Sequence, residues 1–112
     1  MNTADLEQKL SLTRLAGAGA ERELDGCYCG DLLSWVMGRA GEANIWITVM
    51  GNVNSIAVAK LADIGCIILC EGSHLDEDAK KQADINGIPV FSSEIPAYPL
   101  ALMIKDFYAG EL

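Results

Sequence analysis

The chain has 112 residues, 51% of them hydrophobic and 21% charged, which fits one globular domain and is too short for two. Eight basic residues stand against sixteen acidic ones, so the net charge is −8 and the pI is about 4.4. Such a surface argues against nucleic acid as a partner, because phosphate binding needs concentrated cations.

The N-terminal part of the chain predicts two helices separated by two short strands. The first helix begins at the N-cap Thr3 and repeats Leu6 and Leu10 at i, i+4. The second helix has Asp31 as its N-cap, and Gly41 is placed to end it. In chain order, these elements are expected over residues 3–10, 12–16, 24–29 and 32–37.

The rest of the chain alternates apolar runs with amphipathic stretches. Strands are expected over 45–50, 66–70 and 88–92, and helices over 55–64, 75–86 and 99–108. The run from Cys66 to Cys70 is apolar at every position, which is typical of a strand buried on both faces. We expect Gly65 and Gly87 to end helices, Ser73 to cap the helix that follows it, and Pro99 to open the last one.

The strands near residues 24, 45, 66 and 88 recur every 21 or 22 residues, the length of one strand plus one helix. Strands joined through helices form mainly parallel sheets with right-handed crossovers. Because Pro89 has no N–H to donate, the last strand is expected at a sheet edge or with an irregular start. The sequence therefore predicts one α/β domain over residues 1–112, in three layers, with a mainly parallel sheet and helices on both faces.

Candidate ligand contacts follow the strands, because ligands of open parallel sheets bind at the carboxyl ends. These ends carry glycine, which lets a ligand approach the backbone, and neutral Asn and Ser beside helix N-termini. Such groups suit a small polar or phosphorylated ligand; the alternative is that each loop only forms turns and caps. The candidate ligand-binding residues are Tyr28, Gly30, Asp31, Asn52, Asn54, Gly72 and Ser73.

Standard nucleotide and metal motifs do not match this sequence. No Gly-Lys pair forms a Walker A loop, and Arg22 occupies the third-glycine position of a dinucleotide fingerprint that would start at Gly17. The cysteines form two pairs, each on one face of a strand, and neither has the spacing of a zinc knuckle. We interpret Cys27, Cys29, Cys66 and Cys70 as semi-buried thiols, with a metal or iron–sulfur role as the alternative, and expect no cofactor.

The segment from Gly26 to Met37, Gly-Cys-Tyr-Cys-Gly-Asp-Leu-Leu-Ser-Trp-Val-Met, resembles the strand-turn-helix signature of DRTGG-domain proteins. Cys27 stands where the family has the second glycine of Gly-Gly-Tyr, and an uninterrupted Asp-Arg-Thr-Gly-Gly is absent. Further similar segments follow in order at 45–48, 54–59, 67–69, 71–72 and 87–90, so that the resemblance spans residues 12–108.

This resemblance implies a regulatory module. DRTGG domains occur beside CBS domains in a class of inorganic pyrophosphatases and in some phosphotransacetylases, and they resemble the N-terminal domain of HPr kinases. They are linked to dimerisation and regulation, while the neighbouring CBS domains sense adenine nucleotides. Stand-alone members occur in anaerobic bacteria, some encoded near iron-only hydrogenase components, and none is known as an enzyme by itself.

We therefore expect a non-catalytic, homodimeric regulatory or ligand-sensing module that binds an adenine-nucleotide-like molecule. One alternative is a protein-interaction or accessory protein of anaerobic, hydrogenase-linked metabolism without a ligand. Another is a small enzyme that uses Asp31, Glu71 or His74 as acid or base. We also expect a cytoplasmic protein, because the sequence through Glu7 lacks signal-peptide features and no apolar run reaches the roughly 18 residues of a membrane helix.

Overall fold

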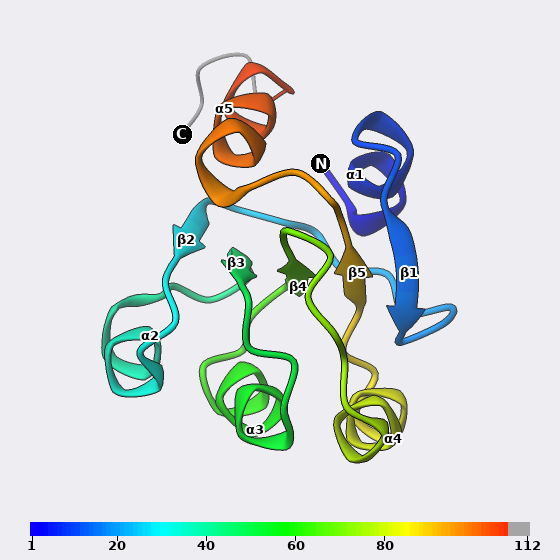
Figure 1. The fold of residues 1–112 in the computed structure, drawn as a ribbon, viewed down its shortest axis with the longest axis vertical. Coiled ribbons are helices and arrows are strands. Elements are labelled where there is room, and N and C mark those ends of the chain that lie inside the picture. The colour runs from blue at the N-terminus through cyan, green and yellow to red at the C-terminus, as the bar shows by residue number, and fades with distance from the viewer. Residues whose placement is uncertain (108–112) are drawn as a thin grey trace.

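A five-stranded sheet divides the molecule into three layers (Figure 1). The computed structural model describes residues 1–107. The strands stand in the order β1-β5-β4-β3-β2, with β2 to β5 parallel and β1 antiparallel to β5. Their bounds are β1 (Thr13–Ala16), β2 (Cys27–Cys29), β3 (Ile45–Thr48), β4 (Cys66–Leu69) and β5 (Val90–Ser92). The predicted mainly parallel sheet is confirmed.

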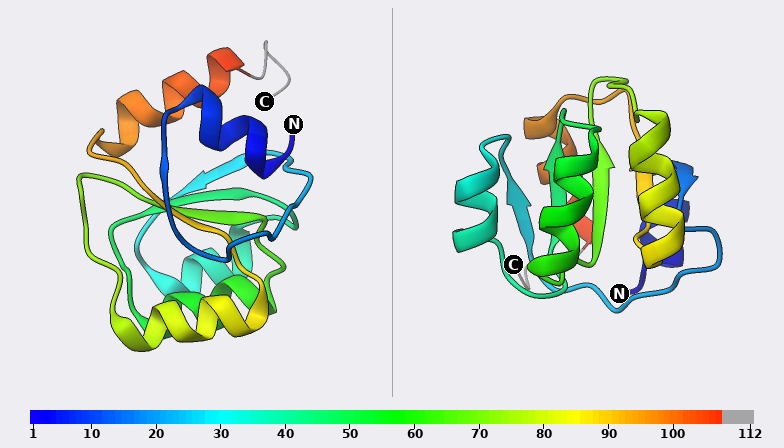
Figure 2. Two further views of the ribbon diagram at one scale, coloured as in Figure 1. Left: turned by 90° about the vertical axis from the view of Figure 1, so that its right-hand side faces the viewer. Right: turned by 90° about the horizontal axis from the view of Figure 1, so that it is seen from below.

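Helices cover both faces of the sheet, which confirms the three-layer α/β class (Figure 2). One face carries α2 (Leu33–Arg39), α3 (Val53–Leu61) and α4 (Glu77–Asn86), and the other carries α1 (Thr3–Lys9) and α5 (Ala97–Phe107). Tyr108, the predicted end of the last helix, lies outside the described residues. Within residues 1–107, every helix is too short or too polar to cross a bilayer.

The three crossover helices lie on the same face of the sheet. Each of α2, α3 and α4 joins two neighbouring parallel strands, and right-handed crossovers that advance in one direction stay on one face. The order of β2 to β5 therefore never reverses, and the parallel strands have no topological switch point that would open a crevice. Any ligand site at their carboxyl ends has to be formed by the loops themselves.

Two apolar cores lie on the two faces of the sheet. Every residue of β3 and β4 is buried, as expected for β4 from its uninterrupted apolar run. Because side chains alternate along a strand, Trp46 and Ile67 face α2, α3 and α4, while Ile45 and Ile68 face α1 and α5. The strand ends are thus held in place from both sides.

The predicted caps of the first two helices are wrong. Asn2, not Thr3, is the N-cap of α1, and it forms a capping box with Asp5. Asp31 does not cap α2; its carboxylate accepts hydrogen bonds from Thr48 Oγ1 and the Val49 N–H. The Asp31 carboxylate that was expected to cap α2 is thus hydrogen-bonded to the end of the neighbouring strand β3 instead. Helix α2 also ends before Gly41, at Arg39 with Ala40 as its C-cap.

Three ends in the second half also differ from the prediction. Ser73 does not cap α4, whose N-cap is Asp76; its hydroxyl donates to the carbonyl of Cys70. Helix α3 ends at Leu61, before Gly65, and α5 begins at Ala97, so Pro99 is its third residue. Gly87 is the C-cap of α4 in the left-handed conformation, as predicted.

Strand β5 lies inside the sheet, between β1 and β4, so its predicted edge position is wrong. Pro89 precedes the strand, and its carbonyl accepts a hydrogen bond from the Ile67 N–H. The register between β1 and β5 shifts between Arg14 and Ala16, next to Val90. The irregular start allowed for by the sequence is present, and the missing proline N–H lies at this irregularity.

Candidate functional site

The loops that follow the parallel strands meet at one edge of the sheet, and backbone hydrogen bonds tie them together. The Gly72 N–H donates to the carbonyl of Ser93 at 2.9 Å, which joins the loop after β4 to the loop after β5. The Asp76 N–H donates to the carbonyl of Gly51 at 2.8 Å, which joins the loop after β3 to the start of α4. Backbone hydrogen bonds therefore fix the positions of these loops without any ligand.

The first depression at this edge, the acidic depression, has a volume of about 270 Å³. Among the residues that line it are Cys29, Gly30, Asp31, Thr48, Cys70 and Glu71. Asp31 is held there by the Thr48 hydroxyl at 2.7 Å and the Val49 N–H at 3.0 Å. With two carboxylates, this depression repels phosphate and favours hydrogen-bond donors such as amino groups.

The second depression, the basic depression, has a volume of about 310 Å³. Gly72, Ser73, His74, Lys80 and Ser92 contribute to its lining. The His74 side chain is 80% exposed, and Lys80 Nζ lies 3.3 Å from Asp84. An ammonium, an imidazole and a hydroxyl at one place suit an anionic group.

The remaining predicted contacts lie outside the linings of these two depressions. Tyr28 is half-buried and packs so closely on Gly30 that a Cβ there would lie 3.1 Å from the tyrosine Cε2. Asn52 is the N-cap of α3, and its side chain accepts from the Ser55 N–H at 3.0 Å. Asn54 is exposed in the first turn of α3.

The structure thus brings the predicted residues together in pairs: Gly30 and Asp31 in the acidic depression, Gly72 and Ser73 in the basic one. Sequence reasoning missed Thr48 and Lys80. Thr48 left a signal, since it is a polar residue at the end of an apolar strand, and it is buried. Lys80 left none, because nothing in the sequence around an exposed helix lysine shows which loop it faces.

The groups named for the enzyme alternative are divided between the two depressions. Asp31 and Glu71 line the acidic depression, whereas His74 lines the basic one. General acid–base catalysis requires the acid and the base to reach one substrate group. Asp31 and Glu71 therefore share one depression, and His74 does not line it.

Cys27 and Cys29 lie on β2, and Cys66 and Cys70 are buried on the same side of the sheet, toward α5. The thiols of Cys27 and Cys29 hydrogen-bond each other, which lowers the pKa of Cys29 to about 7 and raises that of Cys27. Burial raises the pKa of Cys66 to about 12. Within residues 1–107, no three His, Cys, Asp or Glu residues are grouped in a way that would hold a metal ion.

No family model matches this sequence, and no curated protein is significantly similar to it. A crystal structure of the CBS and DRTGG domains of the regulatory region of Clostridium perfringens pyrophosphatase, complexed with the activator diadenosine tetraphosphate, is similar in fold. The TM-score is 0.69 at 12% sequence identity, over 91% of this chain and 45% of that one. This chain therefore spans less than half of that structure and has a fold found within it.

Proposed function

We propose that this chain is a single DRTGG-like domain over residues 1–112 that acts as a non-catalytic regulatory module and binds a small ligand at the carboxyl edge of its sheet. The observation that carries the proposal is the fold, which recurs in a regulatory region solved with a nucleotide activator. The two depressions at the carboxyl edge supply groups for a ligand with one anionic end and one end rich in donors.

The proposed ligand is of the adenine-nucleotide kind. Its phosphates would lie in the basic depression, beside Lys80, His74 and the backbone of Gly72. The exocyclic amino group of a base would donate to Asp31 in the acidic depression, beside Tyr28 and Gly30. We expect Asn52, the N-cap of α3, and Asn54, in its first turn, to contact the part of the ligand between these two ends.

A thermal-shift panel of adenine nucleotides and dinucleoside polyphosphates tests the ligand. A ligand that binds only the folded state raises the melting temperature, and at a hundred times its Kd it adds about 2.7 kcal/mol. Lys80→Ala should weaken the shift, whereas Lys81→Ala, an exposed neighbour on α4 outside the basic depression, should leave it unchanged. A panel without any shift would overturn the ligand part of the proposal.

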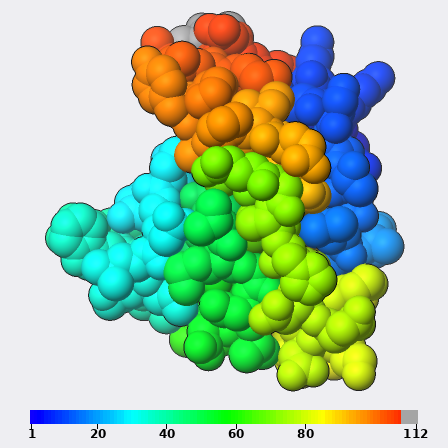
Figure 3. Space-filling view, in the orientation of Figure 1, coloured from blue at the N-terminus to red at the C-terminus, as the bar shows by residue number. Residues whose placement is uncertain are grey.

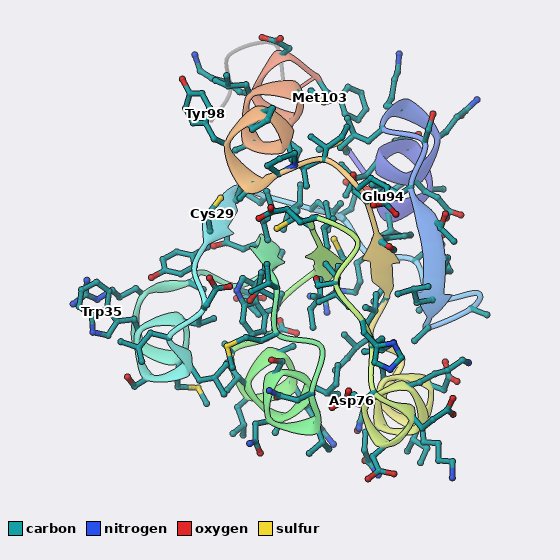
Figure 4. The ribbon with its side chains drawn as sticks, viewed as in Figure 1. Cys29, Trp35, Asp76, Glu94, Tyr98 and Met103 are labelled. Atoms are coloured by element: carbon teal, nitrogen blue, oxygen red, sulfur yellow. The ribbon has the colours of Figure 1, made fainter. Side chains whose placement is uncertain are left out.

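The proposal includes a homodimer, as the family resemblance implies. The outer side of α5 exposes apolar side chains: Tyr98 is 75% exposed, Leu102 45% and Met103 37%. Figure 4 shows Tyr98 and Met103 on this helix. A second copy would cover them, and a small domain gains most from extra apolar burial. Light scattering should give twice the monomer mass, and Tyr98→Ser with Leu102→Ser should halve it; a monomeric parent protein contradicts the dimer.

A protein-interaction or accessory role without a ligand is the second candidate, and the surface of α2 favours it. Leu32 is 58% exposed and Trp35 51%, with the Arg39 guanidinium 3.6 Å from the centre of the Trp35 ring. In the space-filling view, α2 projects from the side of the molecule, away from α5 (Figure 3). Exposed Trp and Arg are typical of interface centres.

Intrinsic fluorescence separates the two candidates, because Trp46 is buried and Trp35 is the exposed tryptophan of the pair. A protein partner bound at α2 should shift the Trp35 emission to shorter wavelength, and Trp35→Phe should abolish that change. A nucleotide bound at the carboxyl edge should raise the melting temperature in Trp35→Phe as much as in the parent protein.

A further inference from the structure

Strand β2 forms a free edge of the sheet in the part of the chain that the structure describes. The Ile45 N–H donates to the carbonyl of Gly26, and the Gly30 N–H donates to the carbonyl of Ile47. In a parallel ladder this alternation directs residues 26, 28 and 30 toward β3. The backbone groups of Cys27 and Cys29 therefore point away from the sheet, and the strand can deform without breaking a second ladder.

The side chains of Cys27 and Cys29 lie on the same face of β2, since they are two residues apart. Cys27 is half-buried and packs against the core beneath α5, whereas Cys29 is exposed and lines the acidic depression. The pKa values of the two thiols shift in opposite directions, as a hydrogen bond between them would shift them. Figure 4 shows Cys29 on the same side of the molecule as Trp35 and Tyr98.

We propose that Cys27 and Cys29 form a reactive dithiol that is converted into an intrastrand disulfide by exchange with a low-molecular-weight disulfide. Cys29 is the attacking thiol, because it is the exposed member of the pair. Cys27, directly behind it on the strand, is the resolving thiol. Cys29 also lines the acidic depression, whereas neither cysteine contributes to the basic depression.

The reaction takes two exchange steps. The Cys29 thiolate attacks one sulfur of the small disulfide, a new bond forms between the two sulfurs, and the first small thiolate leaves and takes up a proton. Cys27 then gives its proton to solvent and attacks Cys29 Sγ, which forms the Cys27–Cys29 bond and releases the second small thiol. Two protein thiols are oxidised, and one small disulfide is reduced to two thiols.

The surroundings of the pair support these roles. A pKa of about 7 at Cys29 lies near neutral pH, where an attacking thiol is most effective, and the hydrogen bond from Cys27 lowers it against the opposing effects of partial burial and of Asp31. In Cys27 the same hydrogen bond, with burial and with Cys29 and Cys66 nearby, raises the pKa. Once Cys29 is a mixed disulfide, the hydrogen bond with Cys29, which is the largest cause of the raised pKa of Cys27, is gone and Cys27 ionises more readily.

The geometry of a strand makes this disulfide readily reversible. Residues i and i+2 of an extended strand lie roughly 6.6 Å apart, from about 3.3 Å per residue. That is close to the upper limit of about 6.8 Å between the Cα atoms of disulfide-bonded cysteines. The bond therefore forms with strain or with local distortion of β2, and strained disulfides are more easily reduced.

Oxidised glutathione and mass spectrometry test the proposal. The reduced protein, treated with this disulfide and quenched in acid, should lose two hydrogens and yield a peptide with Cys27 bonded to Cys29. Cys27→Ser should instead accumulate one glutathione on Cys29, and Cys29→Ser should react at least ten times more slowly. Cys70→Ser, which changes a buried thiol outside the pair, is the control and should behave like the parent protein.

Two outcomes overturn the proposal. The first is a parent protein that accumulates only the mixed disulfide, because Cys27 then does not resolve it. The second is a Cys29→Ser variant that reacts as fast as the parent, because the attacking thiol then lies elsewhere. Circular dichroism of each variant confirms that it is folded before the rates are compared.

Alkylation of Cys29 by iodoacetamide tests the hydrogen bond separately. Cys27→Ala removes the donor, so the Cys29 thiolate should become scarcer and its alkylation at pH 7 about tenfold slower. Cys27→Ser keeps a hydroxyl donor and should restore much of the rate. Equal rates in the parent, Ala and Ser proteins would show that the two thiols do not act as a pair.

Discussion

The two edges of the sheet are built differently. At the β1 edge, Arg14 connects several elements: its guanidinium lies 3.1 Å from Glu7 and 3.6 Å from Glu21, donates to the carbonyl of Gly17 at 2.7 Å, and stacks 4.9 Å from the Phe91 ring centre. Its side chain is only 15% exposed. The antiparallel strand is thus held by side chains as well as by its ladder.

At the β2 edge the strand has three residues and is held by the parallel ladder with β3 and by the Trp46 indole, which donates to the carbonyl of Gly30 at 2.9 Å. None of the ion pairs within residues 1–107 involves β2. The difference separates two roles: substitutions at the β1 edge should affect stability, and substitutions at the β2 edge should affect reactivity with little loss of stability.

The largest expected effect is that of Gly17→Ala, directly after β1. Gly17 has a φ of +75°, and a Cβ there would lie 2.4 Å from the carbonyl oxygen of Ile88, a backbone atom that cannot move aside. We expect a loss of about 3 to 5 kcal/mol in the free energy of unfolding, from left-handed strain and overpacking together. Urea denaturation measures it.

Gly19→Ala is the matched control for this substitution. Gly19 has a similar φ of +79°, but a Cβ there would meet nothing within 4 Å. Its replacement should cost only the conformational strain of about 1 to 2 kcal/mol. Equal losses at both glycines would show that the close approach to Ile88 does not constrain the β1 edge.

The next effect concerns two arginines that both stack on aromatic rings, Arg14 at the β1 edge and Arg39 beside Trp35. Arg14→Ala should cost about 3 kcal/mol, because it leaves the Glu7 carboxylate without its donor and takes one of two donors from the carbonyls of Gly17 and Ala20. Arg39→Ala removes an exposed stack and should cost about 1 kcal/mol or less. Chemical denaturation of both variants tests the ratio; a larger loss for Arg39 would reverse the comparison of the edges.

The strands that are buried on both faces could be predicted from sequence, and the neighbours of the outer strands could not. The apolar run from Cys66 to Leu69 fits only a central position. Pro89 pointed to an edge, but β1 returns from the N-terminus to pair antiparallel with β5 and takes that place. A local pattern does not contain this pairing, because it joins segments more than seventy residues apart.

The sequence predicted that the loops after the strands meet at one edge of the sheet, but not that this edge carries separate acidic and basic depressions. Parallel order alone brings the loops after the strands to one edge, and the structure has them there. The division into acidic and basic depressions depends on Lys80, which reaches the edge from α4, and on Asp31, which Thr48 holds away from the helix it was expected to cap. Both are tertiary contacts, and of the residues that form them only Thr48, a polar residue at the end of an apolar strand, was marked in the sequence.

A smaller effect at the β1 edge should depend on pH. The Asp84 carboxylate accepts a hydrogen bond from the Gly17 N–H at 2.9 Å, and this bond holds the pKa of Asp84 below its ordinary value. A carboxyl group with a lowered pKa stabilises the fold at pH values above its pKa in the unfolded chain. That contribution is lost as the pH falls through the lower pKa of the folded state.

Asp84→Asn removes this titration, so its melting temperature should fall less steeply with acidification than that of the parent protein. Thermal unfolding followed from neutral pH to below the ordinary aspartate range gives both slopes. Asp106→Asn, an exposed position on α5, is the control and should keep the parent slope. Identical slopes for the parent and Asp84→Asn would show that the bond to Gly17 does not contribute to acid stability.

The smallest expected effect on stability is that of Cys29→Ser at the β2 edge. Cys29 is exposed, so exchanging its thiol for a hydroxyl should change the free energy of unfolding by about 0.5 kcal/mol or less. The same exchange at Cys66, which is fully buried among apolar side chains, should cost about 1 to 3 kcal/mol, because the hydroxyl loses water without gaining a partner. Urea denaturation measures the stability of the two variants, and their rates of reaction with a small disulfide measure reactivity. We expect the stability loss in Cys66→Ser and the loss of reactivity in Cys29→Ser. If Cys29→Ser is destabilised as much as Cys66→Ser, the β2 edge is structural, and the contrast between the two edges does not hold.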